Sequence, residues 1–245
     1  MIKHIVYGNG ESRPKDKIIG GEWTTTWGCN AIYRDFAVDN LVSVDYNIQQ
    51  EIYESEYALT NKCWFSDWSI LPDFDTSMML VGNNGPVYET WQGVRKNCVV
   101  QGKTIDSVQR VMDEILTFNP QLDKEDLRKK LEKDIGLYIT WVADNDMVED
   151  IDYPRGWSAG NTALYLACKS GAEEVYMCGF DGSNYSEPLN NIYKGSKNYL
   201  AANSRGFNTT NWDNQFKLVQ KEFSNVQFYK VGTDLTYEEL YNNIR

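Results

Sequence analysis

Residues 2–13 read Ile-Lys-His-Ile-Val-Tyr-Gly-Asn-Gly-Glu-Ser-Arg, a short apolar run cut off by two glycines. A buried strand that ends in glycines is how an α/β sheet brings backbone amides against a phosphate or a sugar. Glycine has no Cβ and tolerates a positive φ, so we expect Gly8 and Gly10 to let a ligand approach the main chain. The dinucleotide fingerprint Gly-x-Gly-x-x-Gly would need a glycine where Arg13 stands. The segment therefore predicts a phosphate or sugar site of another kind, with a simple hairpin turn as the alternative.

The composition is that of a folded protein with an acidic surface. The chain has 245 residues, of which 42% are hydrophobic and 13% aromatic, enough to build a sizeable core in one domain. A net charge of −11 disfavours nonspecific nucleic-acid binding and contact with anionic membranes. No apolar run approaches the roughly 20 residues of a membrane span, and the first residues lack the apolar region of a signal peptide. We expect a soluble, cytoplasmic protein; the sequence does not indicate an oligomeric state.

The cysteines and the single histidine argue against two classes of site. The five cysteines are odd in number and form no Cys-x-x-Cys pair, so we expect buried free thiols rather than disulfides or a zinc site. His4 is the only histidine and lies inside the first predicted strand. A three-histidine metal site and a Ser-His-Asp triad are therefore disfavoured, and we interpret His4 as structural.

Hydrophobic periodicity predicts an alternation of strands and helices over one domain of residues 1–245. After the first strand, strands are expected at 27–32, 41–45, 94–101, 137–142, 174–180 and 226–231. Helices are expected at 47–55 with Asn47 as N-cap, and at 104–118, 122–134, 158–170 (with Gly171 after its end), 212–223 and 237–244. This order predicts an α/β fold with a Rossmann-like, mostly parallel sheet and helices on both faces. Residues 182–211 are polar and without periodicity, and we expect a lid loop there.

Polar residues follow the predicted strands at the edge where an open parallel sheet binds its ligands. Amides and carboxylates there can hold a base and a ribose, and the free amides of a helix start can hold a phosphate. Each residue also has a structural alternative: Asn30 could close a turn, and Asp45 or Ser158 could cap a helix. Taken together they predict a nucleotide site, composed of Gly8, Asn9, Gly10, Asn30, Asp45, Ser158, Gly160, Asn161 and Thr162.

Asp144-Asn145-Asp146 follows a predicted strand and could hold a divalent metal that bridges a diphosphate. The acidic run continues at Glu149, which favours a chance occurrence. No metal ligand is therefore assigned, although metal dependence stays open.

Three pieces of the chain resemble the bacterial sialyltransferase-like glycosyltransferases and the wider superfamily that includes 6-hydroxymethylpterin pyrophosphokinase-like proteins. The first is the segment 8–12, Gly-Asn-Gly-Glu-Ser, where the family has Gly-Asn-Gly-Pro-Ser. The second is Cys-Asn-Ala-Ile-Tyr at 29–33. The third runs from Ser-Ala-Gly at 158–160, through an apolar helix and Gly-Ala-Glu-Glu-Val-Tyr, to Gly-Phe-Asp at 179–181. The matched stretches lie mainly within 2–55 and 155–185.

The resemblance implies that Asn9, Asn30 and Asp45 contact the ribose and phosphates of a nucleotide, and that residues 158–160 contact the base or phosphate. It implies a flexible lid after the Gly-x-Asp strand, with Tyr185, and less directly Ser183, at the family's phosphate-binding tyrosines. The family uses a lid histidine as general base, and this chain has none. Sialic acid as donor sugar is accordingly in doubt.

These observations predict a glycosyltransferase that moves a sugar from a nucleotide-activated donor to an acceptor hydroxyl. Inverting transfer needs a stabilised leaving phosphate and a base at the acceptor. We expect Tyr185 to serve the phosphate and Asp181 to act as base, with Asp213 and Glu187 as rivals. The acceptor could be a saccharide, a lipid-linked glycan or a modified nucleobase, including a virus-encoded DNA modification. The alternatives are a pterin-type pyrophosphokinase using ATP and Mg²⁺ and a nucleotide-binding protein without catalysis.

Overall fold

The computed structural model describes residues 1–18, 23–66, 69–71, 97–102, 116, 121–126, 137–142, 147–151 and 156–240. The chain divides into two compact units, one formed by Met1–Ser66 with Met147–Arg245 and the other by Asp67–Asp146. The sequence alone was interpreted as one domain of residues 1–245.

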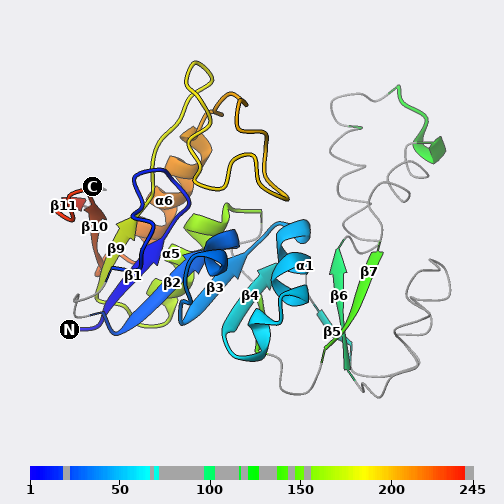
Figure 1. Cartoon of the computed structure of the whole chain (residues 1–245), viewed down its shortest axis with the longest axis horizontal. Coiled ribbons are helices and arrows are strands. Elements are labelled where there is room, and N and C mark those ends of the chain that lie inside the picture. The colour runs from blue at the N-terminus through cyan, green and yellow to red at the C-terminus, as the bar shows by residue number, and fades with distance from the viewer. Residues whose placement is uncertain are drawn as a thin grey trace. The chain divides into compact units, whose positions relative to one another are not determined.

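The first unit is built on an eight-stranded sheet in the order β11-β10-β9-β1-β2-β3-β4-β8 (Figure 1). Every neighbouring pair is parallel except β10 and β11. The central strand β1 is buried over four of its five residues, as expected for a strand covered on both faces. The prediction of a mostly parallel, Rossmann-like α/β sheet is therefore confirmed. The strands are β1 (Lys3–Tyr7), β2 (Thr25–Cys29), β3 (Asn40–Ser43), β4 (Lys62–Ser66), β8 (Val148–Ile151), β9 (Glu174–Cys178), β10 (Gln227–Val231) and β11 (Tyr237–Leu240).

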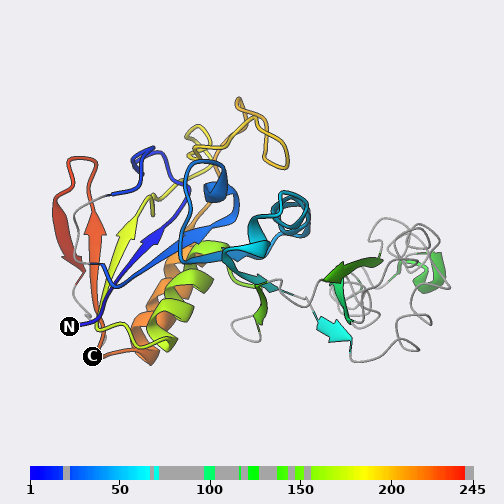
Figure 2. The same cartoon turned by 60° about the horizontal axis from the view of Figure 1, so that its bottom comes forward.

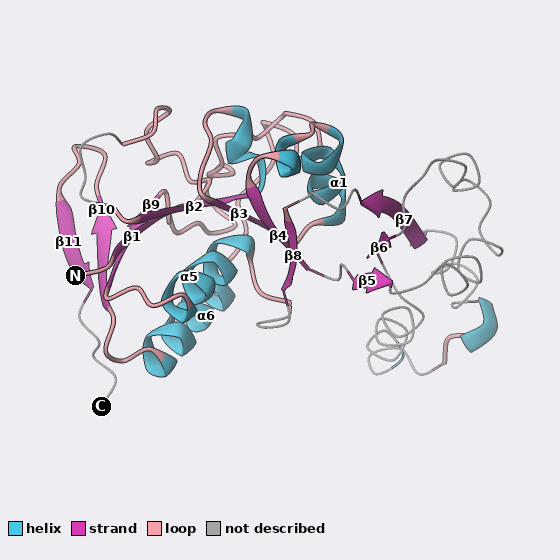
Figure 3. Ribbon diagram, turned by 90° about the horizontal axis from the view of Figure 1, so that it is seen from below, coloured by secondary structure: helices cyan, strands magenta, loops and turns pink. Residues whose placement is uncertain are grey.

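Helices cover both faces of this sheet, as predicted (Figures 2 and 3). On one face lie α1 (Tyr46–Glu54) and the short 3₁₀ helices η1 (Asn30–Arg34) and η2 (Tyr57–Leu59). On the other face α5 (Ala159–Lys169) packs on the sheet beside α6 (Thr210–Glu222). Gly171 follows the end of α5 with a φ of +97°, the left-handed position predicted for it.

The C-terminal prediction was wrong. A helix was expected at 237–244, but Tyr237–Leu240 forms β11, antiparallel to β10. The reason is a tight turn in which the amide of Gly232 donates to the carbonyl of Thr236 at 2.8 Å, with Leu235 in the left-handed region. The turn brings the chain back along the open edge of β10, and Tyr237 packs edge-on against Tyr176 of β9.

The second unit contains a three-stranded antiparallel sheet of β5 (Ser69–Leu71), β6 (Asn97–Gly102) and β7 (Leu137–Val142). The last two strands fall where strands were predicted. The helices expected at 104–118 and 122–134 lie mostly outside the described residues, and the acidic motif at 144–146 lies outside them entirely.

The structure confirms the structural interpretation of His4 and the free state of four cysteines. His4 is buried, and its Nδ1 accepts a hydrogen bond from Trp27 Nε1 at 3.2 Å. Burial raises the thiol pKa of each of the four cysteines to about 12, so all are protonated and unreactive at neutral pH. These buried free thiols are Cys29, Cys63, Cys168 and Cys178. Within the described part of the chain, no helix is long and apolar enough to cross a membrane.

Candidate functional site

The glycines after β1 are required by contacts within the protein. The amide of Gly8 donates to the carbonyl of Cys178 at 2.7 Å, and that of Gly10 to the carbonyl of Gly179 at 2.9 Å. A Cβ on Gly8 would lie 2.5 Å from the Gly179 oxygen, and one on Gly10 would lie 2.5 Å from Asp181 Oδ2. Neither Gly8 nor Gly10 has a left-handed φ, whereas Gly179 has one, at +72°. The two glycines thus let the β1 loop sit directly on the end of β9.

Side chains from the ends of β1, β2 and β3 meet a tyrosine of the long loop in what we call the polar cluster. It consists of the side chains of Asn9, Asn30, Asp45 and Tyr199 together with the backbone amide of Ala31. The Tyr199 hydroxyl accepts hydrogen bonds from Asn9 Nδ2 at 3.4 Å and from the Ala31 amide at 3.3 Å. Asn30 Nδ2 donates to Asp45 Oδ2 at 3.3 Å. Three of the predicted nucleotide-binding residues are therefore brought together.

Asn30 and Asp45 compare differently with their structural alternatives: the conformation of Asn30 suits a turn residue, whereas Asp45 does not cap its helix through its side chain. Asn30 has a φ of +51°, a left-handed conformation that costs free energy for a residue with a side chain. Asp45 is the N-cap of α1, in place of the predicted Asn47, but its side chain makes no capping hydrogen bond. The carboxylate is directed to Asn30 instead, and the surrounding protein raises its pKa by desolvation, against the lowering effect of the Asn30 hydrogen bond.

The polar cluster also contains unpaired acceptors. Asn9 Oδ1 and Asn30 Oδ1 are both buried, and neither has a hydrogen-bond partner among the described residues. A carboxylate only accepts hydrogen bonds, so Asp45 fixes the amide nitrogen of Asn30 toward itself and leaves the Asn30 oxygen facing away. Buried acceptors without donors are uncommon and mark places where a ligand or a water supplies the missing hydrogen.

The start of α5 divides into a part near the β1 loop and a part inside the core. Ser158 caps the helix, because its Oγ accepts from the Asn161 amide at 3.3 Å. Gly160 adjoins the Phe180 ring, with a built Cβ 3.1 Å from it, and a Cβ on Gly8 would lie 3.4 Å from the same ring.

By contrast, Asn161 and Thr162 are buried. Asn161 Nδ2 donates to the Trp212 carbonyl at 3.1 Å and so links α5 to α6. The structure therefore brings Gly160 near the β1 loop through the Phe180 ring, and Ser158 caps the same helix, whereas the side chains of Asn161 and Thr162 lie within the helix packing.

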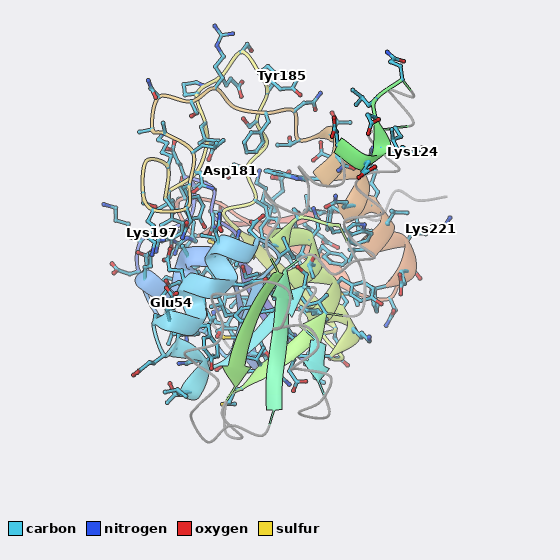
Figure 4. The ribbon with its side chains drawn as sticks, turned by 90° about the vertical axis from the view of Figure 1, so that its right-hand side faces the viewer. Glu54, Lys124, Asp181, Tyr185, Lys197 and Lys221 are labelled. Carbon is cyan, nitrogen blue, oxygen red and sulfur yellow. The ribbon has the colours of Figure 1, made fainter. Side chains whose placement is uncertain are left out.

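The two predicted catalytic residues lie apart: Asp181 is where the long loop leaves the sheet, and Tyr185 is farther out on that loop (Figure 4). Asp181 is at the base, where one carboxylate oxygen accepts from the Ser12 amide at 2.9 Å and the other accepts from the Ser12 hydroxyl. Tyr185 is at the outer end and is 66% exposed. In this conformation Asp181 anchors the β1 loop, and Tyr185 faces solvent.

The lid loop lies over the polar cluster, and two of its attachments involve an arginine. In the first, the buried Arg13 donates from Nη2 to Asp35 Oδ2 at 2.6 Å and to the Tyr193 hydroxyl at 2.8 Å, and that hydroxyl donates to Asp35. The second lies nearer the surface, where Glu51 of α1 accepts from Arg34 and, at 2.7 Å, from Asn198 Nδ2.

Arg34 also holds the loop directly, donating from Nη1 to Ser196 Oγ at 2.8 Å and from Nη2 to the Lys197 carbonyl at 3.1 Å. Burial alone would raise the pKa of Glu51, but hydrogen bonds from Tyr33, Arg34 and Asn198 and the charge of Arg34 lower it. Glu51 is therefore ionised at neutral pH, which keeps this second attachment charged.

Sequence reasoning missed Tyr199 and the second attachment. Tyr199 lies in the stretch recognised as a lid, but its partners are separated from it by more than 160 positions. Arg34 and Glu51 are ordinary surface residues in sequence, and only the fold places them under the loop.

The described residues contain no group of three or more metal-ligating side chains. Comparison of the chain with models of protein families, with curated proteins and with solved structures finds no match.

Proposed function

We propose that this chain is a glycosyltransferase that takes its sugar from a nucleotide-activated donor. The single observation that carries the proposal is the hydrogen-bonding character of the polar cluster. It presents the unpaired carboxamide oxygens of Asn9 and Asn30 and the carboxylate of Asp45, which makes no capping hydrogen bond to α1. All of these groups can accept hydrogen bonds. A ribose offers two neighbouring hydroxyls that can donate to such acceptors, as an acidic residue at a strand end receives them in other nucleotide-binding sheets.

The neighbouring elements suit the rest of a nucleotide. The start of α5 lies close to the β1 loop through the Phe180 ring, and the amides of a helix start favour a phosphate. We place the ribose at the polar cluster and the phosphate at the start of α5, beside the Phe180 ring that lies between Gly160 and Gly8. No metal is assigned, and a cytoplasmic location fits the four buried free thiols.

The transfer step needs a base, and Asp181 remains our candidate under one condition. Each of its oxygens accepts one hydrogen bond from Ser12, and each keeps a second lone pair, so Asp181 can take a proton from an acceptor hydroxyl if that hydroxyl reaches the free side of the carboxylate. Tyr185 has to turn inward from its exposed position to reach a leaving phosphate. Both requirements place the chemistry in a conformation that follows donor binding.

Nucleotide binding can be tested by thermal unfolding in the presence of CMP, UDP, GDP and ATP, each with and without Mg²⁺. A rise in melting temperature with CMP or a nucleoside diphosphate supports the proposal. A rise with ATP and Mg²⁺ alone favours the pyrophosphokinase instead. No rise with any of the four contradicts a nucleotide site.

Asn30→Gly locates the site, because glycine tolerates the left-handed φ at position 30 while removing the carboxamide. The thermal shift should disappear in this variant. Asn61→Ala is the matched control. Asn61 also makes local hydrogen bonds, with Tyr57 and Thr60, but it precedes β4 and so lies at the amino ends of the parallel strands, away from the polar cluster at their carboxyl ends. An unchanged shift in Asn30→Gly would remove Asn30 from the site.

A nucleotide-binding protein without catalysis is the second candidate. The engagement of Asp181 by Ser12 and the outward position of Tyr185 favour it. The two candidates separate in an assay for sugar release from a nucleotide sugar that binds: hydrolysis or transfer above background supports the enzyme, and tight binding without turnover supports the binding protein.

A further inference from the structure

Tyr199 occupies the polar cluster but satisfies it poorly. Its hydroxyl accepts from Asn9 Nδ2 and the Ala31 amide at 3.4 and 3.3 Å, both near the outer limit of hydrogen bonding. Among the described residues, none accepts the hydroxyl proton of Tyr199. Asn9 Oδ1 and Asn30 Oδ1 stay unpaired beside it. The tyrosine therefore occupies the position without donating a hydrogen bond to the acceptors around it.

The segment that carries Tyr199 is a small turn closed on itself. The amide of Gly195 donates to the Leu200 carbonyl at 2.7 Å, and the amide of Tyr199 donates to the Ser196 carbonyl at 3.1 Å. Gly195, with a φ of +79°, joins this turn to the buried anchor at Tyr193. We call residues 195–200 the plug turn.

The plug turn itself is more exposed to water than the anchor before it. Gly195, Lys197, Asn198 and Leu200 are exposed, whereas Tyr193 of the anchor is 7% exposed and the side chain of its partner Arg13 is fully buried. The ion pairs at both places are partly open to water, through Asp35 at the anchor and through Arg34 and Glu51 at the plug turn. Hydrogen bonds and ion pairs near water are worth less than buried ones, because water competes for the same groups. The plug turn is therefore the part that can leave while residues 190–193 stay in place.

We propose that Tyr199 is an internal occupant of the ligand site: its hydroxyl holds the position of a ligand hydroxyl, and the plug turn must lift for the ligand to bind. This inference rests on the proposed function for the class of ligand, a nucleoside with vicinal hydroxyls. Such a ligand accepts from the Ala31 amide and Asn9 Nδ2, as the tyrosine does, and in addition donates to the unpaired carboxamide oxygens. The exchange completes the hydrogen bonding of the polar cluster.

The movement of the plug turn can be measured without any ligand. Trypsin cleavage after Lys197, followed by mass spectrometry, reports the population in which the turn is open. Tyr199→Phe and Glu51→Gln each remove hydrogen bonds that hold the turn, and cleavage should accelerate about fivefold in each. Glu222→Gln is the control, because Glu222 ends α6 on the opposite face of the sheet (Figure 3). Equal cleavage rates in wild type, Tyr199→Phe and Glu51→Gln would overturn the proposal.

The displacement itself is tested with whichever of CMP, UDP or GDP raises the melting temperature. At a saturating concentration that nucleotide should increase cleavage after Lys197, and Tyr199→Phe should bind it about fivefold more tightly than wild type. Protection of Lys197 by the nucleotide, or weaker binding by Tyr199→Phe, would show that Tyr199 closes on the ligand and would overturn the proposal. If none of the three nucleotides raises the melting temperature, the proposed function fails, and the cleavage rates of the variants alone decide whether the plug turn opens.

Discussion

His4 makes the acid sensitivity of this protein testable at one residue. Desolvation lowers its pKa below 6.5, against smaller raising effects of the Ala167 backbone and Asp39. Below pH 6.5 the unfolded chain therefore binds a proton at His4 that the folded chain does not bind. The contribution of neutral His4 to the free energy of unfolding is complete above pH 6.5. It falls by about 1.4 kcal/mol for each pH unit between 6.5 and the lowered folded pKa.

Urea unfolding of wild type and His4→Gln across pH 7.5 to 5 measures this contribution. Glutamine does not titrate and keeps an acceptor for Trp27 Nε1, the present partner of the ring. The variant should lose less stability on acidification than wild type. Parallel pH profiles would show that His4 is already free to ionise in the folded protein.

Gly10 and Gly182 differ in the space around them: Gly10 has no room for a Cβ, whereas Gly182 has. A Cβ on Gly10 would lie 2.5 Å from Asp181 Oδ2 and 2.7 Å from the Gly179 carbonyl oxygen, so the β1 loop has to move away from β9. We expect Gly10→Ala to lower the free energy of unfolding by roughly 1–3 kcal/mol and to abolish any nucleotide-induced thermal shift.

Gly182→Ala is the control, because its Cβ would meet only Thr209 Oγ1 at 3.8 Å. It should unfold within about 0.5 kcal/mol of wild type and keep the shift. Equal behaviour of the two variants, measured by chemical denaturation, would mean that the tight packing of the β1 loop on β9 carries no function.

At the scale of single residues, the sequence predicted which residues come together better than it predicted the contacts they make. Gly8 and Gly10 were selected because the lack of a Cβ lets a ligand approach the main chain, and in the structure the same lack of a Cβ lets residues 179–181 approach it. Asn30 and Asp45 were selected as strand-end residues, and the structure places them in hydrogen-bond contact. A single sequence cannot supply such contacts, since they depend on how neighbouring strands pair.

At the scale of elements, the two helix caps near the site give opposite expectations. Ser158 caps α5 through its side chain, so Ser158→Ala should cost about 1 kcal/mol of stability. Asp45 sits at the N-cap of α1 without a capping hydrogen bond, so Asp45→Ala should cost clearly less and should instead weaken nucleotide binding. Chemical denaturation and nucleotide titration of both variants measure the two effects. A larger loss of stability in Asp45→Ala than in Ser158→Ala would show that the carboxylate supports the helix after all.

Elements with strong periodicity were predictable, and those defined by tertiary pairing were not. β7 matches its predicted range, and α1, α5, α6, β9 and β10 fall within one to two residues of theirs. β4 and β8 were not predicted as strands, because β8 is short and acidic and becomes a strand only by pairing with β4. Likewise β11 reads as a helix until the turn after β10 sets it on the sheet edge. Local propensity is overridden in both cases by hydrogen bonds to a distant strand.

At the scale of the whole molecule, every member of the polar cluster belongs to the first unit. Residues 9, 30, 31, 45 and 199 all lie within Met1–Ser66 and Met147–Arg245. The second unit enters between β4 and β8, which are neighbours in the sheet and pair in parallel from Cys63 with Val148 to Ser66 with Ile151. The polar cluster is thus built from segments that precede and follow the second unit in the sequence. The strands that carry its members pair with one another without any strand of the second unit between them.

Replacing residues 67–146 by a flexible linker tests this independence. A Gly/Ser linker of about 12 residues has a root-mean-square reach of roughly 17–21 Å, enough to run back along one short strand from the end of β4 to the start of β8. We expect the shortened chain to unfold cooperatively and to keep the nucleotide-induced thermal shift of the full chain, and Asn30→Gly in the same background should remove that shift. A shortened chain that has native circular dichroism but shows no shift would place part of the binding site in the second unit.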